Sequence, residues 1–127
     1  MIESGDIIVF VKNMIAYRLF VLSSPTRDID SVVLVPVSEY PRESYVEVNV
    51  RLESRQFGEA HVERVAFGFD EADDNYTAGQ VEDWLNDKET FSNTYLDKRR
   101  VSESSLQDVL KAARDSGMPD DLKWNLG

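Results

Sequence analysis

The 127-residue chain has no cysteine and only one histidine, His61. Without cysteine it forms neither a disulfide nor a thiolate metal site, and one histidine falls short of the ligand sets that hold zinc. We therefore expect no metal and no cofactor. The absence of disulfides is also typical of proteins that work in a reducing compartment, which predicts a cytoplasmic protein.

Long apolar runs and targeting signals are missing as well. No stretch of the sequence approaches the roughly 20 apolar residues that span a bilayer. The N-terminus has no basic region followed by an apolar segment, so no secretory signal is expected. The length predicts one domain, residues 1–127, with a modest core and no membrane association.

Basic residues are scarce: the chain has 14 of them against 24 acidic ones, for a formal net charge of −10. Much of the acid lies in the segment 70–74 and between Glu82 and Glu89. Proteins that bind nucleic acid usually carry a basic stripe that neutralises phosphates, so this charge counts against a generic nucleic-acid binder. The charge fits either a basic protein partner or a simply solvated surface.

Short β-rich runs separated by turn residues predict most of the chain. The predicted strands cover residues 5–12, 17–23, 32–37, 45–52, 60–67 and 91–96. The first two form a hairpin that turns at Lys12-Asn13-Met14. The third is apolar on both faces and is expected to be central, whereas the fourth alternates as a half-buried antiparallel strand does.

Two helices have recognisable start signals. Thr77 and Gln80 form a capping box, and the apolar residues that follow lie on one side of a short helix. A second helix begins near Ser102 or Ser104 and is stopped at Gly117. Together the elements predict an α+β, mostly β fold: a small, strongly bent antiparallel sheet or SH3-like barrel with a C-terminal helix. The acidic segment 70–75 is the best candidate for a mobile loop.

One arginine and one hydroxyl are notable beside the first three predicted strands. Arg18 lies in the run Tyr17–Ser23, and Ser38 follows Pro36 at the end of the third strand. If the two side chains meet on adjacent strands, they form a small anion site, and phosphate is the commonest anion that such a pair holds. Alternatively, Arg18 is a solvated arginine of an edge strand and Ser38 caps a strand end.

The order of these runs resembles the MazF/PemK/Kid toxin family and its relative CcdB, over residues 4–40 and 98–114. That family reads Gly-Asp-Ile/Val, then Arg-Pro-x-Leu-Val-Leu/Ile-Ser, then a hydrophobic strand that ends in Pro-x-Thr/Ser. The matching residues here are Gly5-Asp6-Ile7, Arg18-Leu19-Phe20-Val21-Leu22-Ser23, Pro36-Val37-Ser38 and, before a helix, Lys98-Arg99-Arg100-Val101-Ser102. The chain departs from the family in three places: Leu19 replaces the proline, Ser38 replaces the commoner threonine, and only Val11–Ala16 stands where the family has a long loop.

The resemblance implies a metal-independent endoribonuclease of a toxin–antitoxin system that cleaves single-stranded RNA. By position, Arg18 would stabilise the charge that develops on the scissile phosphate, and Ser38 would hydrogen-bond a phosphate oxygen. The adjacent 2′-hydroxyl would be the nucleophile, assisted by an acid and a base. The resemblance also implies a homodimer and an antitoxin partner.

His61 is the natural candidate for the acid or base, because it titrates near neutral pH. It lies between Glu59 and Glu63, which alternate to the same face of the predicted strand. A histidine in this setting is more often a solvated member of an ion-pair lattice. His61 is therefore kept as a possible acid or base beside Arg18 and Ser38.

Two non-enzymatic alternatives stay open. The first is a protein-binding member of the same fold, either a CcdB-like binder of gyrase or a degenerate toxin. The acidic charge, Leu19 and the short loop favour it. The second is an unrelated acidic module, such as a phage-type inhibitor or DNA mimic. The apolar Trp124 near the end of the chain either docks on the body or contacts a second subunit or partner.

Overall fold

The computed structural model describes residues 2–87, 95–97, 99–123 and 126. Its strands are β1 (Ile7–Lys12), β2 (Ile15–Val21), β3 (Ser31–Ser38), β4 (Val46–Ser54), β5 (Ala60–Phe67), β6 (Asp73–Thr77), β7 (Tyr95–Asp97) and β8 (Arg99–Val101). Its helices are the 3-10 turn η1 (Phe69–Glu71), α1 (Ala78–Asn86), α2 (Glu103–Arg114) and α3 (Asp120–Lys123). Residues 91–94 of the sixth predicted strand and the Trp124 tail lie outside the described residues.

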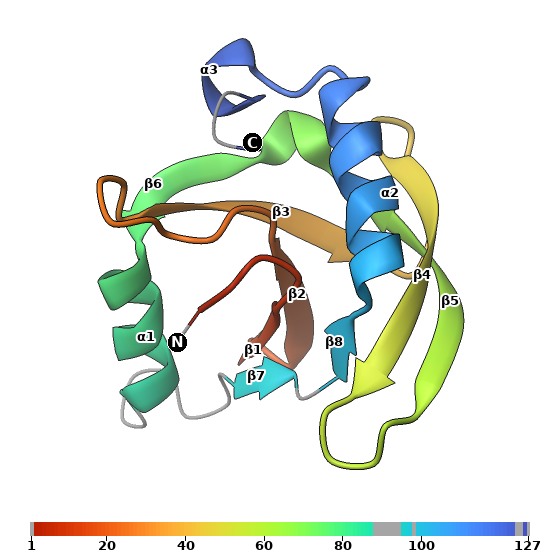
Figure 1. Cartoon of the computed structure of the whole chain (residues 1–127), viewed down its shortest axis with the longest axis horizontal. Helices are drawn as coiled ribbons and strands as arrows, with labels where there is room; N and C mark the ends of the chain where they lie inside the picture. The colour runs from red at the N-terminus through yellow and green to blue at the C-terminus, as the bar shows by residue number, and fades with distance from the viewer. Residues whose placement is uncertain (1, 88–94, 98, 124–125, 127) are drawn as a thin grey trace.

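The predicted α+β, mostly β fold is confirmed. One antiparallel sheet runs in the order β7-β1-β2-β3-β5-β4-β8, and β6 pairs with β3 beside this path. Because β7 and β8 are almost consecutive in sequence but pair with opposite ends of the sheet, the sheet curls into a nearly closed barrel (Figure 1). The Val101 N–H donates to the Gly5 carbonyl at 3.2 Å and helps to join these ends.

The first hairpin turns where the sequence predicted. Asn13 and Met14 both have positive φ, 52° and 64°, and Lys12 pairs with Ile15. Left-handed backbone at both central residues is the signature of a type I′ turn, whose twist matches that of the two strands. β1 and β2 are therefore held in a fixed register, which aligns Val9 with Arg18.

Pro36 lies inside β3 without interrupting it. The carbonyl of Val33 accepts a hydrogen bond from the N–H of Leu22, just after β2. The backbone N–H and C=O groups of odd-numbered residues in β3 therefore point toward β2, and those of even-numbered residues point toward the opposite edge of β3. On that edge the partner changes, from β6 opposite Leu34 to β5 opposite Val37. Pro36 occupies the change of partner, where its missing N–H costs no ladder hydrogen bond.

The expectation of a mobile loop at residues 70–75 was wrong. Its first part forms η1, and Asp73–Thr77 forms β6 on the edge of β3. Within β6, Tyr76 packs against Trp84 with ring centroids 4.7 Å apart. Acidic composition is compatible with an edge strand, because only one of its faces needs to be buried.

The apolar side chains form two layers. The first fills the barrel and continues under α2 and α3, with Phe20, Phe67 and Val109 among its fully buried members. The second lies on the outer face of β1–β3, where Val81 of α1 covers Val21. Figure 1 shows the two long helices on different sides of the barrel.

Both helix starts predicted from the sequence are confirmed. Thr77 and Gln80 form a reciprocal capping box at the start of α1. Ser102 caps α2, and its hydroxyl accepts from the Ser105 N–H at 3.3 Å. Among the described residues, no helix is long and apolar enough to cross a membrane.

Candidate functional site

Arg18 lies near the middle of β2, directly opposite Val37 of β3. Side chains of paired residues share a face of the sheet, so Arg18 points with Phe20 and Val37 toward the barrel interior, at its open end. Its Nη1 donates to Glu39 Oε1 at 2.9 Å. The two side chains are 38% and 59% exposed, so the pair is solvated, but the guanidinium already has a carboxylate partner.

Ser38 points to the opposite face. It follows Val37 in β3, and successive residues of a strand alternate between faces. The Ser38 Oγ accepts the Tyr40 N–H at 3.1 Å, which is a local turn bond at the end of the strand. The structure thus gives Ser38 a strand-ending role, and the Arg18 guanidinium and the Ser38 hydroxyl do not converge on one point.

The open end of the barrel, which we call the mouth, is ringed by charged side chains. Arg99 donates to Glu63 at 3.3 Å and to Asp97 at 3.4 Å, and Arg18 with Glu39 forms the other ion pair. The hydrogen bond that Arg99 donates to Asp97 raises the pKa of Arg99, against the opposing effect of burial. The enclosed space is only about 30 Å³, enough for about one or two water molecules. The mouth is too small to hold a substrate in this conformation.

His61 lies on β5 and is separate from this arrangement. Its side chain is 52% exposed, and its Nε2 lies 3.6 Å from Glu59 Oε2. His61 does not line the mouth, nor the larger hollow beside Arg18 that is described next. The structure shows the ion pair with a neighbouring glutamate that the sequence suggested, but it does not place His61 near Arg18 and Ser38.

A larger hollow, which we call the rim hollow, lies on the outer face of β2 and β3. Its volume is about 440 Å³, within the roughly 300–1,000 Å³ of small-ligand sites. Its apolar and aromatic lining includes Phe10, Tyr17, Leu19, Pro36, Tyr40 and Tyr45. Phe10 and Tyr17 stack across the β1–β2 hairpin with ring centroids 5.1 Å apart. α1 packs on another part of this sheet face, and among the described residues neither α1 nor α2 lines the rim hollow.

Polar groups are placed around the rim hollow. Arg18, Ser38 and Glu39 border it, and so do Arg42 and Glu71. Each arginine already has partners: Arg18 pairs with Glu39, and Arg42 lies over a tyrosine ring, as described next. The rim hollow is therefore an aromatic surface with matched charges and not a basic one.

Tyr45 anchors one wall of the rim hollow. Its hydroxyl donates to Glu71 Oε2 at 2.9 Å, and the Arg42 guanidinium lies 5.2 Å from the centre of its ring. Burial, and then the hydrogen bond to Glu71, raises the pKa of Tyr45, so the phenol remains a donor at neutral pH. A Cβ at Gly68 would lie 2.6 Å from the Tyr45 ring, so only glycine at position 68 permits this packing.

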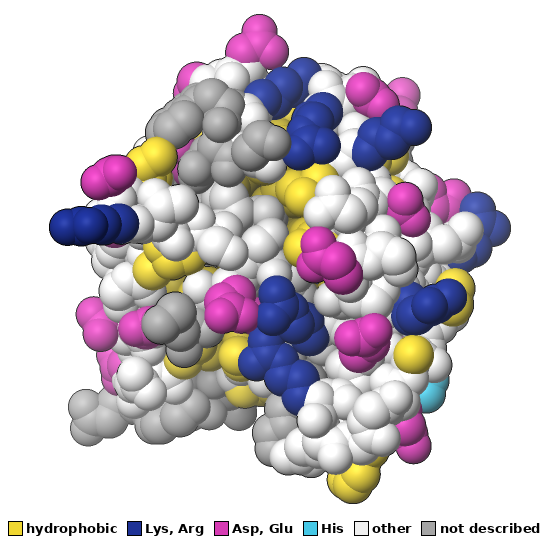
Figure 2. Space-filling view, viewed as in Figure 1, with side chains coloured by type: hydrophobic (Ala, Val, Ile, Leu, Met, Phe, Trp, Pro, Cys, Tyr) yellow, Lys and Arg dark blue, Asp and Glu magenta, His cyan; other side chains and the backbone are white. Residues whose placement is uncertain are grey.

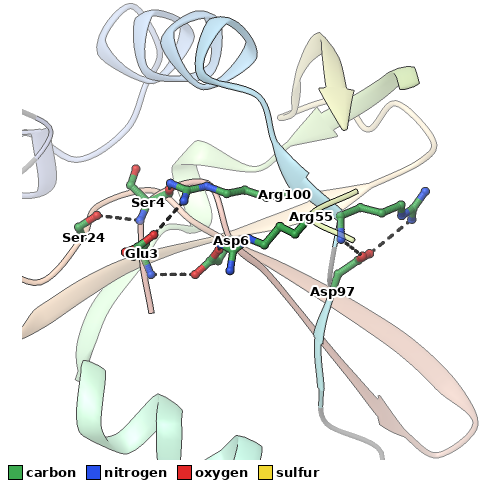
Figure 3. A network of polar contacts seen from close by, with 8 residues as sticks. Glu3, Ser4, Asp6, Ser24, Arg55, Asp97 and Arg100 are labelled. Carbon is green, nitrogen blue, oxygen red and sulfur yellow. Dashed lines mark hydrogen bonds and ion pairs between the residues drawn. The ribbon is translucent and has the colours of Figure 1, made fainter. Parts of the chain in front are cut away.

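The most conspicuous sequence motif, Gly5-Asp6, has a structural role (Figure 3). Asp6 is 1% exposed, and its carboxylate accepts the Glu3 N–H at 2.8 Å and Arg55 Nη2 at 2.8 Å. Arg100 donates to Glu3 Oε2 at 2.8 Å and to the Ser4 carbonyl at 2.7 Å. These contacts tie the start of β1 to the end of β4 and to β8, which closes the barrel.

The sequence did not reveal the rim hollow. Its tyrosines come from a strand and from the loop between β3 and β4, and no local pattern connects Tyr17 with Tyr40 and Tyr45. The only local signal is the pair of tyrosines, Tyr40 and Tyr45, in a segment that is otherwise polar. Across the described residues, no group of three or more histidine, aspartate or glutamate side chains is arranged to hold a metal ion.

No protein family, curated protein or solved structure matches the chain. The resemblance to the MazF/PemK and CcdB families therefore stays a prediction that rests on the quoted motifs. Function has to be argued from the site itself.

Proposed function

We propose that this protein is a non-enzymatic binding module that holds a segment of a partner protein in the rim hollow. The observation that carries the proposal is the state of Arg18: its guanidinium is bound by Glu39 at 2.9 Å, while the aromatic hollow beside it is open. A phosphate would have to share the guanidinium with that carboxylate, against a molecular net charge of −10. Tyrosine and arginine are the residues that protein interfaces favour.

The exposure of the tyrosines supports a protein partner. Tyr40 is 77% exposed and Tyr17 is 43% exposed, yet both line a concave surface. Tyrosine offers a large contact area with few rotatable bonds, so ordering it at an interface costs little entropy. An apolar or aromatic side chain of the partner would fill the hollow. A CcdB-like interaction with gyrase belongs to this class.

We expect the double variant Tyr17→Ala/Tyr40→Ala to lose peptide binding. The probe is a displayed random library of peptides of about a dozen residues, selected on the immobilised wild-type protein. Removing both rings should weaken the binding of the selected peptides about tenfold or more, since tyrosines at interface hot spots contribute about 2 kcal/mol or more. The measurement is the dissociation constant by fluorescence anisotropy.

The control for this experiment is Phe57→Ala. Phe57 is 77% exposed, as Tyr40 is, but does not line the rim hollow. The proposal fails if no peptide is enriched, or if every enriched peptide binds the double variant as tightly as the wild type.

A metal-independent endoribonuclease of a toxin–antitoxin system is the second candidate. Arg18 and Ser38 both border the rim hollow, although from different faces, and exposed tyrosines are platforms on which single-stranded bases stack. A homodimer and an antitoxin belong to this candidate as predictions. The DNA-mimic alternative is not favoured, because acidic and basic side chains are interspersed on the face drawn in Figure 2.

Cleavage of a long unstructured RNA in EDTA tests the second candidate. A ribonuclease would cut at discrete sites, and Arg18→Ala would reduce the rate about a hundredfold or more, as loss of a transition-state charge contact does. The control is Arg64→Ala, because Arg64 on β5 forms a similar ion pair, at 2.8 Å, with Glu47 on β4. Intact RNA at high protein concentration would rule this candidate out.

A further inference from the structure

One edge of β5 is open over most of its length. β5 pairs with β4 from Ala60 to Phe67, but with β3 only at Ala66 and Phe67. Among the residues that the structure describes, no strand pairs with Ala60–Val65 on the β3 side. The outer face of this stretch is exposed as well: Val62 is 68% exposed and the Arg64 side chain is 73% exposed. We call this stretch the β5 edge.

The hydrogen-bonding groups of the β5 edge alternate in a known phase. Ser54 N–H donates to the Glu59 carbonyl, which makes Glu53 and Ala60 a non-hydrogen-bonded pair of the β4–β5 ladder. The pattern repeats every second residue, so Val62 and Arg64 also turn their N–H and C=O groups away from β4. The Gly68 N–H, which donates to Pro36 in β3, has the same phase.

The other edge of this hairpin is covered from Arg51 to Ser54, next to the turn between β4 and β5. On β4, β8 pairs with Leu52, Glu53 and Ser54, and the Arg51 carbonyl accepts the Ser102 N–H at the start of α2. On the β5 side, β3 ends at Ser38, whose hydroxyl accepts the Tyr40 N–H and turns the chain away. The turn at Ser38 thus leaves vacant the position that β3 would occupy if it continued along β5.

Charge indicates what would fill this position. The chain has a net charge of −10, so a second copy of itself would be repelled. Glu59 lies at the start of the β5 edge with only His61 as its ion-pair partner among the described residues, whereas Glu63 and Glu39 at the mouth are already paired with Arg99 and Arg18. A positively charged segment complements Glu59 and the net charge of the molecule. An open edge also accepts any extended backbone, because its N–H and C=O groups need partners.

We propose that the β5 edge binds an extended, basic segment of a partner protein, which adds as a strand antiparallel to β5 in the position vacated by β3. Backbone hydrogen bonds to Ala60, Val62 and Arg64 supply the affinity, and lysine or arginine side chains facing Glu59 supply the charge match. This surface goes beyond the proposed function: it uses the backbone of β5, whereas the rim hollow uses a tyrosine on β2 and tyrosines in the loop between β3 and β4. The mouth, which Glu63 and Val65 of the β5 edge also line, shares Arg18, Val37 and Glu39 with the rim hollow.

The decisive variant is Val62→Pro. The Val62 N–H faces away from β4, so proline at this position removes a group of the β5 edge without removing a bond of the β4–β5 ladder. The control is Val62→Thr, which keeps the N–H and the β-branched shape. Peptides selected from the displayed random library on the wild-type protein are the probe, and affinities are measured by anisotropy at low and high salt.

We expect basic peptides with alternating β-branched residues, which bind the wild type and Val62→Thr within about twofold and lose about tenfold or more on Val62→Pro. Their affinity should fall as salt rises. Hydrogen exchange should slow at the amides of Ala60, Val62 and Arg64 when the peptide binds. N-methylation of alternate peptide amides should abolish binding, whereas methylation of the intervening amides should not, and this readout requires no protein variant.

Three results would overturn the inference. One is that no basic extended peptide is enriched. Another is that the enriched peptides bind Val62→Pro as they bind the wild type while losing affinity for Tyr17→Ala/Tyr40→Ala, which would support the rim hollow instead. The last is a concentration-dependent dimer that Val62→Pro abolishes, which would assign the β5 edge to a second copy of the chain.

Discussion

Replacing Phe67 by alanine should lower the free energy of unfolding by about 3–5 kcal/mol, as large-to-small changes of buried aromatics do. Phe67 is 1% exposed and lies where β3, β4 and β5 meet. Its ring packs edge-on against Phe20, with centroids 5.2 Å apart, and stacks on Phe69 at 5.8 Å. Its loss removes both contacts and leaves a cavity. Urea denaturation followed by tryptophan fluorescence measures the change.

Two controls separate the cavity from the chemistry of this substitution. Phe67→Leu retains most of the volume and should cost clearly less than Phe67→Ala. Phe57→Ala removes the same ring from an exposed position and should change stability by less than about 0.5 kcal/mol. If Phe67→Ala costs no more than Phe57→Ala, the packing at the β3–β5 junction is not as described.

Replacing Asp6 by alanine should lower the free energy of unfolding by about 2–4 kcal/mol, the sum of a lost charged hydrogen bond and an orphaned donor. The Asp6 carboxylate is almost completely buried and accepts the Glu3 N–H and the Arg55 guanidinium, both at 2.8 Å. Alanine leaves the Glu3 amide without its acceptor in a partly buried position. Because Arg55 is 47% exposed, water can take over its part of the interaction. Urea denaturation at neutral pH measures the loss.

Glu39→Ala is the matched control for Asp6. Both carboxylates accept an arginine, at 2.9 and 2.8 Å, but the Glu39 side chain is 59% exposed and that of Asp6 is 1% exposed. A solvated ion pair contributes about 0–1 kcal/mol, so Glu39→Ala should be nearly neutral. Equal effects of the two variants would contradict a structural role of the Gly5-Asp6 motif in closing the barrel.

The strands and helices could be predicted because their signals are local. Val46–Leu52 alternates in the sequence as it does in β4, and Thr77 caps α1 through residues only three positions away. The segment 70–75 was mispredicted because its composition reads as solvated, whereas its conformation is decided by β3, about 40 residues earlier in the chain, with which it pairs. Composition does not report a partner so distant in sequence.

The candidate site illustrates the same limit. The sequence correctly brought Arg18 and Ser38 to adjacent strands, but a shift of one residue in register decides whether two side chains share a face. With Val37 opposite Arg18, Ser38 points the other way and ends the strand. His61 was drawn to the site only by its chemistry, and the fold places it on β5 with Glu59.

By itself, the sequence determined the mostly β composition, the hairpin turn at Asn13-Met14, the helix caps and the net charge, since each depends on residues close together or on a simple sum. Only the tertiary structure decided that Glu39 forms an ion pair with Arg18, that Asp6 binds Arg55 where the barrel closes, and that one edge of β5 is open among the described residues. These features join residues that are far apart in sequence. They depend on strand order and register, which are set by how the whole core packs.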